Sequence, residues 1–445
     1  MKRYFLIFIT IALFLGGCTK EKGAIPVPLK GDPYSPAVKN LSTNTNITAD
    51  LSVETTISAG NNTYKKQQTG ILSYQNYGCE NETYCLQGNI AYGDYNIPLR
   101  EIQATDKHYL VLKEQSFCSE LKADAMQIPL QLLDPALYKT ATLTQDKKTQ
   151  YLQYSDPTGP ESWALPVNAE FTDAAAAATL DSRGQILQAQ YTVVYHYGDI
   201  RYEEKYVLTY QSTAVANIHV PEQTSCIPVE DIYAALYLEQ AYGYLQQVTN
   251  VNGVLTEKIN SDASSIHYSQ EITLNTSAER TNIETTVKLW DNARGSESGY
   301  TQSEVFKDGQ YAISRDGGQY NEQSGMDANA IHGYCQKLLT KNIPSCTYIE
   351  NCAISQTDNM MTLTIQAGEA LAETICQNSC QTIYQDANFL DSKSSDYEDY
   401  TVSYVITIDS YSGLPLYSAL DFTGHHTIEN IRYQLSTQYI QEYTY

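Results

Sequence analysis

Two short stretches, TLDSRG at 179–184 and TIDSYSG at 407–413, set the expectation for the fold. Each carries an apolar run into an Asp-Ser turn that ends in glycine. Each is also followed, after a similar interval, by the tripeptide IRY, at 200–202 and at 431–433. Asp, Ser and Gly are residues that tight turns favour. The nearly constant separation of the two copies predicts a duplicated unit; chance similarity between short segments is the alternative.

The residues around each turn alternate in polarity, as strands with one buried face do. Apolar residues fall on one face of the third strand in both copies: Ile200, Tyr202, Tyr206, Leu208 and Tyr210, then Ile431, Tyr433, Leu435 and Tyr439. Ala174 to Ala178 favours a helix by propensity, but it precedes the first turn as 402–406 precedes the second, so we interpret it as a strand. The pair Asp308-Gly309, between apolar stretches, predicts a further hairpin. These patterns predict antiparallel meanders.

Three segments are candidates for helices: 119–133, 229–248 and 368–384. The second begins after Pro228 and carries an apolar stripe with helical spacing. The sequence therefore predicts an α+β protein. We expect two tandem copies of a curved antiparallel sheet, each a half-barrel-like meander with a few helices packed on one side. The predicted repeats are 49–226 and 227–445.

The chain begins with the parts of an export signal in order. Lys2 and Arg3 precede an apolar run that is shorter than the about 20 residues of a transmembrane helix. The LGGC at 15–18 resembles the lipobox of bacterial lipoproteins. This resemblance implies that residues 1–17 are a signal peptide and that Cys18 receives a diacylglyceryl anchor. The polar, proline-containing segment 18–48 then predicts a flexible tether.

Composition narrows the choice of partners. The chain has 28 basic and 51 acidic residues, a formal net charge of −23, which disfavours nucleic acid and anionic lipid headgroups as partners. Its 38 tyrosines far outnumber its 8 phenylalanines, which suits half-buried strands with a ring inside and a hydroxyl near water. The lipid bilayer, reached through Cys18, is the predicted partner.

Nine cysteines remain once Cys18 is set aside, and in an exported protein pairing is favoured over metal binding. Cys79 with Cys85, and Cys346 with Cys352, each enclose a short loop and are candidate disulfides. Cys376 and Cys380 lie one helical turn apart, so each would need a more distant partner. A zinc site built from the last four of these cysteines is the less favoured alternative.

No pattern in the sequence predicts catalysis, a cofactor or a metal site. His-Glu-x-x-His, Gly-x-Ser-x-Gly and Walker motifs are absent from the sequence. The acidic run 391–399 lacks the spacing of a helix-loop-helix calcium site. His425 and His426 follow a glycine and indicate a solvated turn. We therefore expect that the protein is not an enzyme.

The lipobox, the polar tether and the long meander with a few helices resemble the LolA-like and LppX-like lipoprotein carriers. That resemblance implies a half-open barrel that holds acyl chains, although a tandem pair with nine further cysteines departs from it. We expect a non-catalytic binding module, for an amphiphilic or hydrophobic ligand, on the extracytoplasmic face of a bacterial membrane. This is the cell membrane, or the outer membrane where there are two. The alternatives are a structural or protein-interaction component of the cell envelope and, with less support, a surface hydrolase.

Overall fold

The fold is taken from a computed structural model of the chain. It describes residues 24–445 except 42–43, 45, 78, 105–106, 121–133, 159–167, 212–217, 223–224, 263–265, 278, 292–294, 324, 358, 387–396 and 429–430. The predicted signal peptide and Cys18 lie outside the described residues, as does most of the acidic run 391–399.

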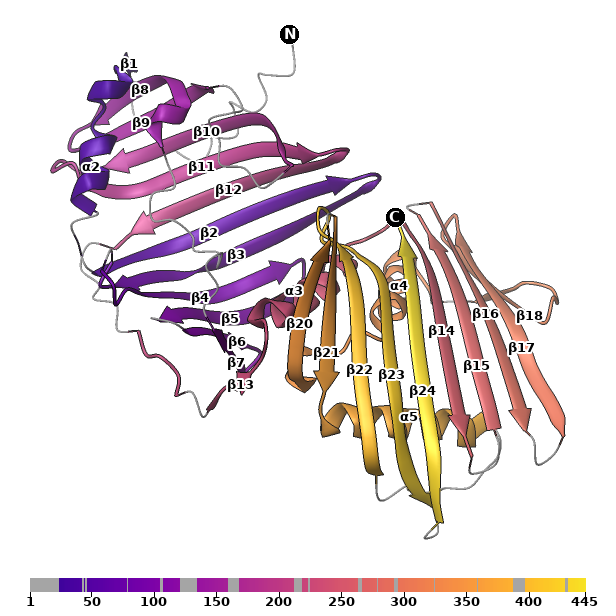
Figure 1. The fold of residues 1–445 in the computed structure, drawn as a ribbon. Helices are drawn as coiled ribbons and strands as arrows, with labels where there is room; N and C mark the ends of the chain where they lie inside the picture. Colours follow the sequence, from indigo (N-terminus) through magenta and orange to yellow (C-terminus); the bar gives the residue numbers. More distant parts are fainter. Residues whose placement is uncertain are drawn as a thin grey trace.

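The first sheet contains thirteen strands in the spatial order β1-β8-β9-β10-β11-β12-β2-β3-β4-β5-β6-β7-β13 (Figure 1). Neighbouring strands are antiparallel except for β13, which pairs in parallel with β7. The strands are β1 (Ile25–Pro26), β2 (Asn46–Ala59), β3 (Asn62–Gln75), β4 (Thr83–Tyr92), β5 (Tyr95–Ala104), β6 (Lys107–Leu112), β7 (Gln115–Glu120), β8 (Tyr138–Asp146), β9 (Thr149–Pro157), β10 (Glu170–Leu180), β11 (Ile186–Tyr197), β12 (Ile200–Tyr210) and β13 (Ile227–Pro228).

The second sheet contains eleven antiparallel strands in the order β19-β18-β17-β16-β15-β14-β24-β23-β22-β21-β20. The strands are β14 (Val251–Ser261), β15 (Ile266–Thr276), β16 (Arg280–Asp291), β17 (Ser296–Lys307), β18 (Gln310–Arg315), β19 (Asn321–Gln323), β20 (Ile349–Thr357), β21 (Met360–Ala367), β22 (Tyr397–Asp409), β23 (Pro415–Ile428) and β24 (Ile431–Thr444).

The two sheets share one topology. In the first, a meander from β8 to β12 lies beside a meander from β2 to β7; in the second, β20 to β24 lies beside β14 to β19. The last strand of each half pairs with its first long strand, β12 with β2 and β24 with β14. The two IRY tripeptides begin these corresponding strands, β12 and β24. The sequence repeat therefore marks equivalent places in two sheets of the same strand order.

Four α-helices and three short 3₁₀ turns are described besides the strands. They are α2 (Tyr34–Leu41), α3 (Ile232–Leu245), α4 (Ala328–Thr340), α5 (Glu369–Asp386), η1 (Leu29–Gly31), η2 (Pro135–Leu137) and η5 (Cys346–Tyr348). Helix α3 lies between the two sheets, whereas α4 and α5 pack on the second sheet (Figure 1). Among the described residues, no helix is both long enough and apolar enough to span a membrane.

The predicted α+β class is wrong, because the described chain is mainly β. Its two large sheets, of thirteen and eleven strands, are not half-barrels with a few helices over one side. Long strands joined by tight turns account for most of the chain and leave few residues for helices. For example, β2 runs for 14 residues, and its partner β3 follows after a tight turn. Of the candidate helix 119–133, residues 119 and 120 continue β7 and the rest lies outside the described residues.

Several local predictions are confirmed. The alanine run is part of β10, paired on both sides. The 308–309 hairpin joins β17 to β18, with positive φ at both turn residues. Two of the predicted helices correspond to α3 and α5, and α3 begins after Asp231, whose carboxylate accepts a hydrogen bond from the amide of Tyr233 at 3.0 Å. Helix α4 was not predicted.

The segment expected to be a flexible tether is partly folded. Helix α2 lies within it and buries Tyr34 and Ala37 against β8 to β11. Asp32 accepts hydrogen bonds from the amide of Tyr34 at 2.9 Å and from the hydroxyl of Tyr154 at 3.2 Å. The buried ring of Tyr34 and the hydrogen bonds to Asp32 thus attach this segment to the first sheet. The boundaries proposed for the two repeats stay a prediction.

Candidate functional site

The two Asp-Ser turns are both capped by the side chain of their aspartate, although the second turn is one residue longer than the first. In the first half, Asp181 accepts hydrogen bonds from the amides of Arg183 and Gln185, both at 2.8 Å. In the second, Asp409 accepts from the amides of Tyr411 and Ser412, also at 2.8 Å. Both turns end on a glycine with φ near +74°, Gly184 at 74° and Gly413 at 73°. Glycine is required there because a side chain is strained in this left-handed conformation.

The surroundings of the two turns differ. A Cβ atom on Gly184 would have open space around it, whereas one on Gly413 would lie 2.7 Å from the ring of Tyr244 in α3. The second turn docks on the first sheet. The hydroxyl of Tyr64 donates to the carbonyl of Ser412 at 2.6 Å, and the hydroxyl of Tyr202 donates to the carbonyl of Tyr411.

Helix α3 completes this junction from between the sheets. The ring of Tyr244 makes edge-to-face contacts with Tyr64 and Tyr92 of the first sheet, with centroids 5.0 and 4.8 Å away. A Cβ on Gly243 would lie 2.4 Å from the ring of Tyr92, so only glycine lets the helix come this close. The largest core cluster therefore runs without a break from the first sheet through α3 into the second sheet.

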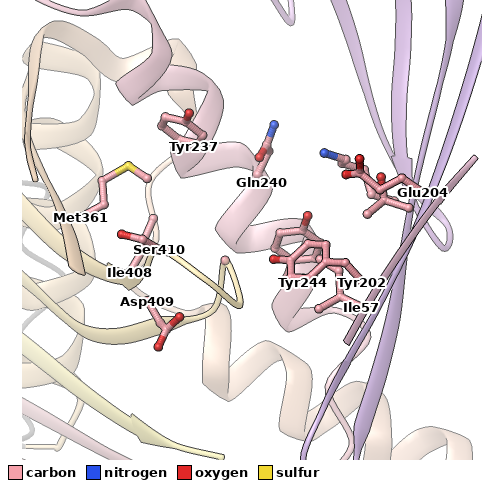
Figure 2. Close-up of a pocket in the computed structure, with 13 residues that line it drawn as sticks. Ile57, Tyr202, Glu204, Tyr237, Gln240, Tyr244, Met361, Ile408, Asp409 and Ser410 are labelled. Atoms are coloured by element: carbon pink, nitrogen blue, oxygen red, sulfur yellow. The ribbon is translucent and has the colours of Figure 1, made fainter. Parts of the chain in front are cut away.

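A cleft opens where the first sheet, α3 and the docked turn meet, with a volume of about 140 Å³ (Figure 2). The first sheet and α3 contribute aromatic and polar side chains, and the second half contributes Met361 and the docked turn. The lining residues are Thr55, Ile57, Lys66, Tyr202, Glu204, Tyr237, Gln240, Tyr244, Met361, Ile408, Asp409, Ser410 and Gly413.

Two hydroxyl groups in this lining are buried without a hydrogen-bond partner among the described residues: Thr55 Oγ1 and Ser410 Oγ. Thr55 is only 2% exposed, and the amide of Ser410 is held by the carbonyl of Asn359 at 3.0 Å. An unsatisfied buried polar group costs about 1–3 kcal/mol, and native proteins usually satisfy it with water or a ligand. Both hydroxyl oxygens are covered in this structure, and the residues that carry them line the cleft.

Two charged side chains of the cleft already have hydrogen-bond partners within the protein. Asp409 is engaged by the turn amides, and Glu204 accepts a hydrogen bond from the hydroxyl of Tyr206 at 2.9 Å. Burial raises the pKa of Tyr202 and of Tyr244, so both hydroxyls stay protonated at neutral pH. The lining therefore combines apolar faces with neutral hydroxyl groups and a few charges.

A buried ionic network lies deeper in the same junction. Glu239 of α3 is 2% exposed and accepts a hydrogen bond from the amide of Cys346 at 2.8 Å. Its other oxygen is 2.8 Å from Lys113 Nζ and accepts a hydrogen bond from the hydroxyl of Tyr95, both in the first half. Since every partner of this carboxylate is supplied, we interpret the network as a structural link between the halves.

A second buried carboxylate, Glu101, has two partners at its Oε1 atom. It lies 2.9 Å from Nε2 of His108 and accepts a hydrogen bond from the hydroxyl of Tyr233 at 3.0 Å. The histidine is 2% exposed and its ring meets Tyr233 edge to face. This cluster faces α3 at the edge of the first sheet and does not line the cleft.

The predicted cysteine pairs are not joined in this structure. All nine cysteines after Cys18 are described, and all are free thiols. Cys79 is exposed in a turn while Cys85 is buried on β4. Cys346 and Cys352 contact different groups: the amide of the first donates to Glu239, and the thiol of the second donates to the carbonyl of Asp231 at 3.3 Å. Each of these two cysteines therefore has a hydrogen-bond partner other than the other cysteine.

The metal-site alternatives find no support among the residues that the structure describes. No group of three or more His, Cys, Asp or Glu side chains there could hold a metal ion, which includes the four cysteines considered for zinc. His425 lies on β23, not in a turn, because β23 continues to Ile428; its Nδ1 is 3.1 Å from the guanidinium of Arg432.

Comparison with known proteins yields little. No family model matches the chain, and no curated protein matches it. LprF from Mycobacterium bovis is 10% identical, with a TM-score of 0.23, over 46% of this chain and 92% of its own. A putative AttH from Nitrosomonas europaea is 6% identical, with a TM-score of 0.12, over 88% and 92% of the two chains. OprD of Pseudomonas aeruginosa is 6% identical, with a TM-score of 0.11, over 90% and 95%.

These likenesses carry no argument about function, because their TM-scores lie far below that of a shared fold. The cleft was not predicted from the sequence, although the sequence placed some of its residues in the correct elements. Tyr202 belongs to the predicted alternating strand, and Tyr237 and Tyr244 belong to the apolar stripe of the predicted helix 229–248. Nothing local to those segments indicated that they would meet the turn at 409–413.

Proposed function

We propose that this chain is a non-catalytic binding protein, anchored through Cys18 on the extracytoplasmic face of a membrane, that takes a small amphiphilic ligand into the cleft at the junction of its halves. The observation that carries the proposal is the mixed lining of this cleft, where apolar side chains and tyrosine rings lie beside Thr55 and Ser410, whose hydroxyls lack partners among the described residues. A ligand with a hydroxyl, amide or ester group would pair with either hydroxyl once that side chain turns toward the cleft.

The remaining lining supports an amphiphile. Ile57, Met361 and Ile408 offer apolar surface, and the rings of Tyr202 and Tyr244 offer apolar faces with donor hydroxyls. Lys66 and Glu204 add one charge of each sign to the lining.

Size limits what can enter. Drug-sized ligands use pockets of about 300 Å³ or more, whereas a cavity of roughly 150 Å³ accepts a group the size of benzene. At about 140 Å³ the cleft suits a compact amphiphilic group, with any longer chain left outside.

The first test is native mass spectrometry of the full chain, extracted from membranes in a mild non-ionic detergent. A co-purifying small molecule supports the proposal. Binding is then measured with two probes, a total lipid extract of the host membrane and 4-ethylphenol as a compact amphiphile. A protein that carries no bound species and takes up neither probe would overturn it.

The duplication offers a matched pair of variants. Ser410→Leu fills the cleft and removes one hydroxyl, so we expect binding of the responsive probe to weaken at least tenfold, since about 1.4 kcal/mol corresponds to a factor of ten. Ser182→Leu makes the same change at the equivalent exposed turn of the first half and should leave binding unchanged. Equal loss in both variants would indicate a general folding defect and count against the site.

A further inference from the structure

The segment that leads into α3 crosses the edge of the first sheet. Its two-residue strand β13 pairs in parallel with β7, so that Pro228 lies opposite Cys118. The amide of Val229 then donates to the carbonyl of Cys118 at 2.9 Å. Earlier in the same segment, Ile218 and Val220 pack against a small cluster of buried side chains at this edge of the sheet. The start of the second half is thus attached to the last hairpin strand of the first.

Two cysteines meet at this attachment. Cys118 is 5% exposed on β7, and Cys226, just before β13, is 8% exposed. Both belong to a small cluster with Ile102 and Tyr109. Burial, together with the adjacent thiol of Cys226, raises the pKa of Cys118, which is the effect expected when two sulfurs lie side by side away from water.

We propose that Cys118 and Cys226 form a disulfide that fastens the segment entering α3 to the edge of the first sheet. The proposal differs from the pairs that loop length favoured, Cys79 with Cys85 and Cys346 with Cys352. It rests on the pairing of β13 with β7, which brings the segment of Cys226 beside the strand of Cys118, and on the burial of both cysteines in one cluster.

The chemistry requires a disulfide-bearing oxidant, which an exported protein meets as a dithiol–disulfide oxidoreductase or a small disulfide of the envelope. The thiolate of Cys226 attacks one sulfur of the oxidant, and the oxidant's other sulfur leaves as a thiolate. The thiolate of Cys118 then attacks the sulfur of Cys226 in this mixed disulfide, and the oxidant's sulfur leaves as a second thiolate. Two protons and two electrons leave the protein, and the oxidant becomes two thiols. Because both cysteines are buried, the reaction takes place as the chain folds or when β13 opens.

The disulfide would close a long loop, from β7 to the entry of α3. Cross-links that close long loops restrict the unfolded chain most. Here the link would also fix the helix that forms one wall of the junction between the sheets, because α3 begins at Ile232, four residues after Pro228.

The test is thiol mapping of the full chain, with free thiols blocked before proteolysis. After refolding with reduced and oxidised glutathione, we expect a peptide joined through Cys118 and Cys226. We also expect two fewer alkylated cysteines than in the fully reduced chain. Alkylation of both residues in the oxidised protein, stable attachment of glutathione to either one, or a pairing of either with a different cysteine would each overturn the proposal.

The melting temperature tests whether this disulfide stabilises the folded protein. Oxidised wild-type protein should melt about 5–10 °C above the reduced protein, whereas Cys118→Ser and Cys226→Ser should show no such redox difference. Cys335→Ser is the matched control, because it removes a cysteine of α4 that is also buried but belongs to the large core cluster, away from Cys118 and Cys226. That variant should keep the full redox difference, and its loss there would contradict the assignment.

Discussion

The two Asp-Ser turns of this chain are similar in sequence and in their aspartate cap, but they have different surroundings. At 181–184 the turn is exposed, and a side chain on its glycine would meet open space. At 409–413 the aspartate again caps a turn that ends in glycine, but this turn packs between α3 and the first sheet and accepts hydrogen bonds from Tyr64 and Tyr202. The second copy has thus become part of the junction between the halves and of its cleft. Two turns of similar sequence thus differ in role because their neighbours differ.

The cores of the halves differ in the same way. The second sheet, its helices and α3 share one continuous cluster, rich in aliphatic side chains such as Leu363 and Ile365. The first sheet is divided into that cluster and three separate ones, in which tyrosines such as Tyr154 and Tyr195 are prominent. The same strand order therefore supports a single core in one half and a divided, tyrosine-rich core in the other.

Alkaline pH should produce the largest effect and should act on the first half before the second. Burial raises the pKa of many tyrosines along β9 to β12, for example that of Tyr197 to about 12. The folded state keeps these phenols neutral while the unfolded chain ionises near pH 10. Their stabilising contribution is therefore complete below pH 10 and is lost as the pH rises toward the folded values, at about 1.4 kcal/mol per unit and residue.

The measurement is tyrosinate absorbance at 295 nm, combined with hydrogen exchange to locate the opening. We expect a cooperative rise above pH 10, with exchange in β9 to β12 preceding exchange in β21 to β24. Simultaneous opening of both sheets would show that the junction couples them more tightly than the divided core suggests.

Glu239→Ala should come next in size, because it removes the carboxylate that joins α3 to both halves. Lys113, Tyr95 and the amide of Cys346 would lose their common partner. Breaking a buried ion pair in this way costs about 3–5 kcal/mol. Urea unfolding followed by circular dichroism should show reduced stability and a broader transition as the halves separate. Glu54→Ala is the control, since its contact with Lys65 is exposed and about 0–1 kcal/mol is expected.

Alanine at the two turn glycines compares the copies directly. Both Gly184→Ala and Gly413→Ala place a side chain at positive φ, which costs about 1–2 kcal/mol. Gly413→Ala adds a clash with the ring of Tyr244, so we expect about 1–3 kcal/mol more at this site. The free energy of unfolding of each variant decides the matter, and equal losses would contradict the docking of the second turn.

Tyr202→Phe should have the smallest measurable effect. It removes the hydrogen bond to the carbonyl of Tyr411 but keeps the ring, so about 1 kcal/mol of stability should be lost. Tyr320→Phe provides the comparison because that side chain is 55% exposed, and its change should stay within about 0.5 kcal/mol. Thermal unfolding of the two variants in parallel tests the difference.

The local structure was largely predictable because its causes are short-range. Alternating polarity identified β12 and β24, the Asp-Ser-Gly pattern identified the two turns, and Asp308-Gly309 identified a hairpin. The stripe of 229–248 identified α3. Each of these signals depends on hydrogen bonds or side-chain faces within a few residues of one another. The export signal and the lipid anchor at Cys18, also read from adjacent residues, stay predictions.

The fold class and the cleft depended on contacts that no local pattern records. The hydroxyl of Tyr64 reaches the carbonyl of Ser412 across 348 positions of the chain. Cys118 and Cys226 meet only because β13 pairs with β7. By itself the sequence determined the strands, the turns and their repetition, since neighbouring residues specify them. Only the tertiary structure decided which of two similar turns docks against α3, because that choice depends on the shape of surfaces assembled from both halves.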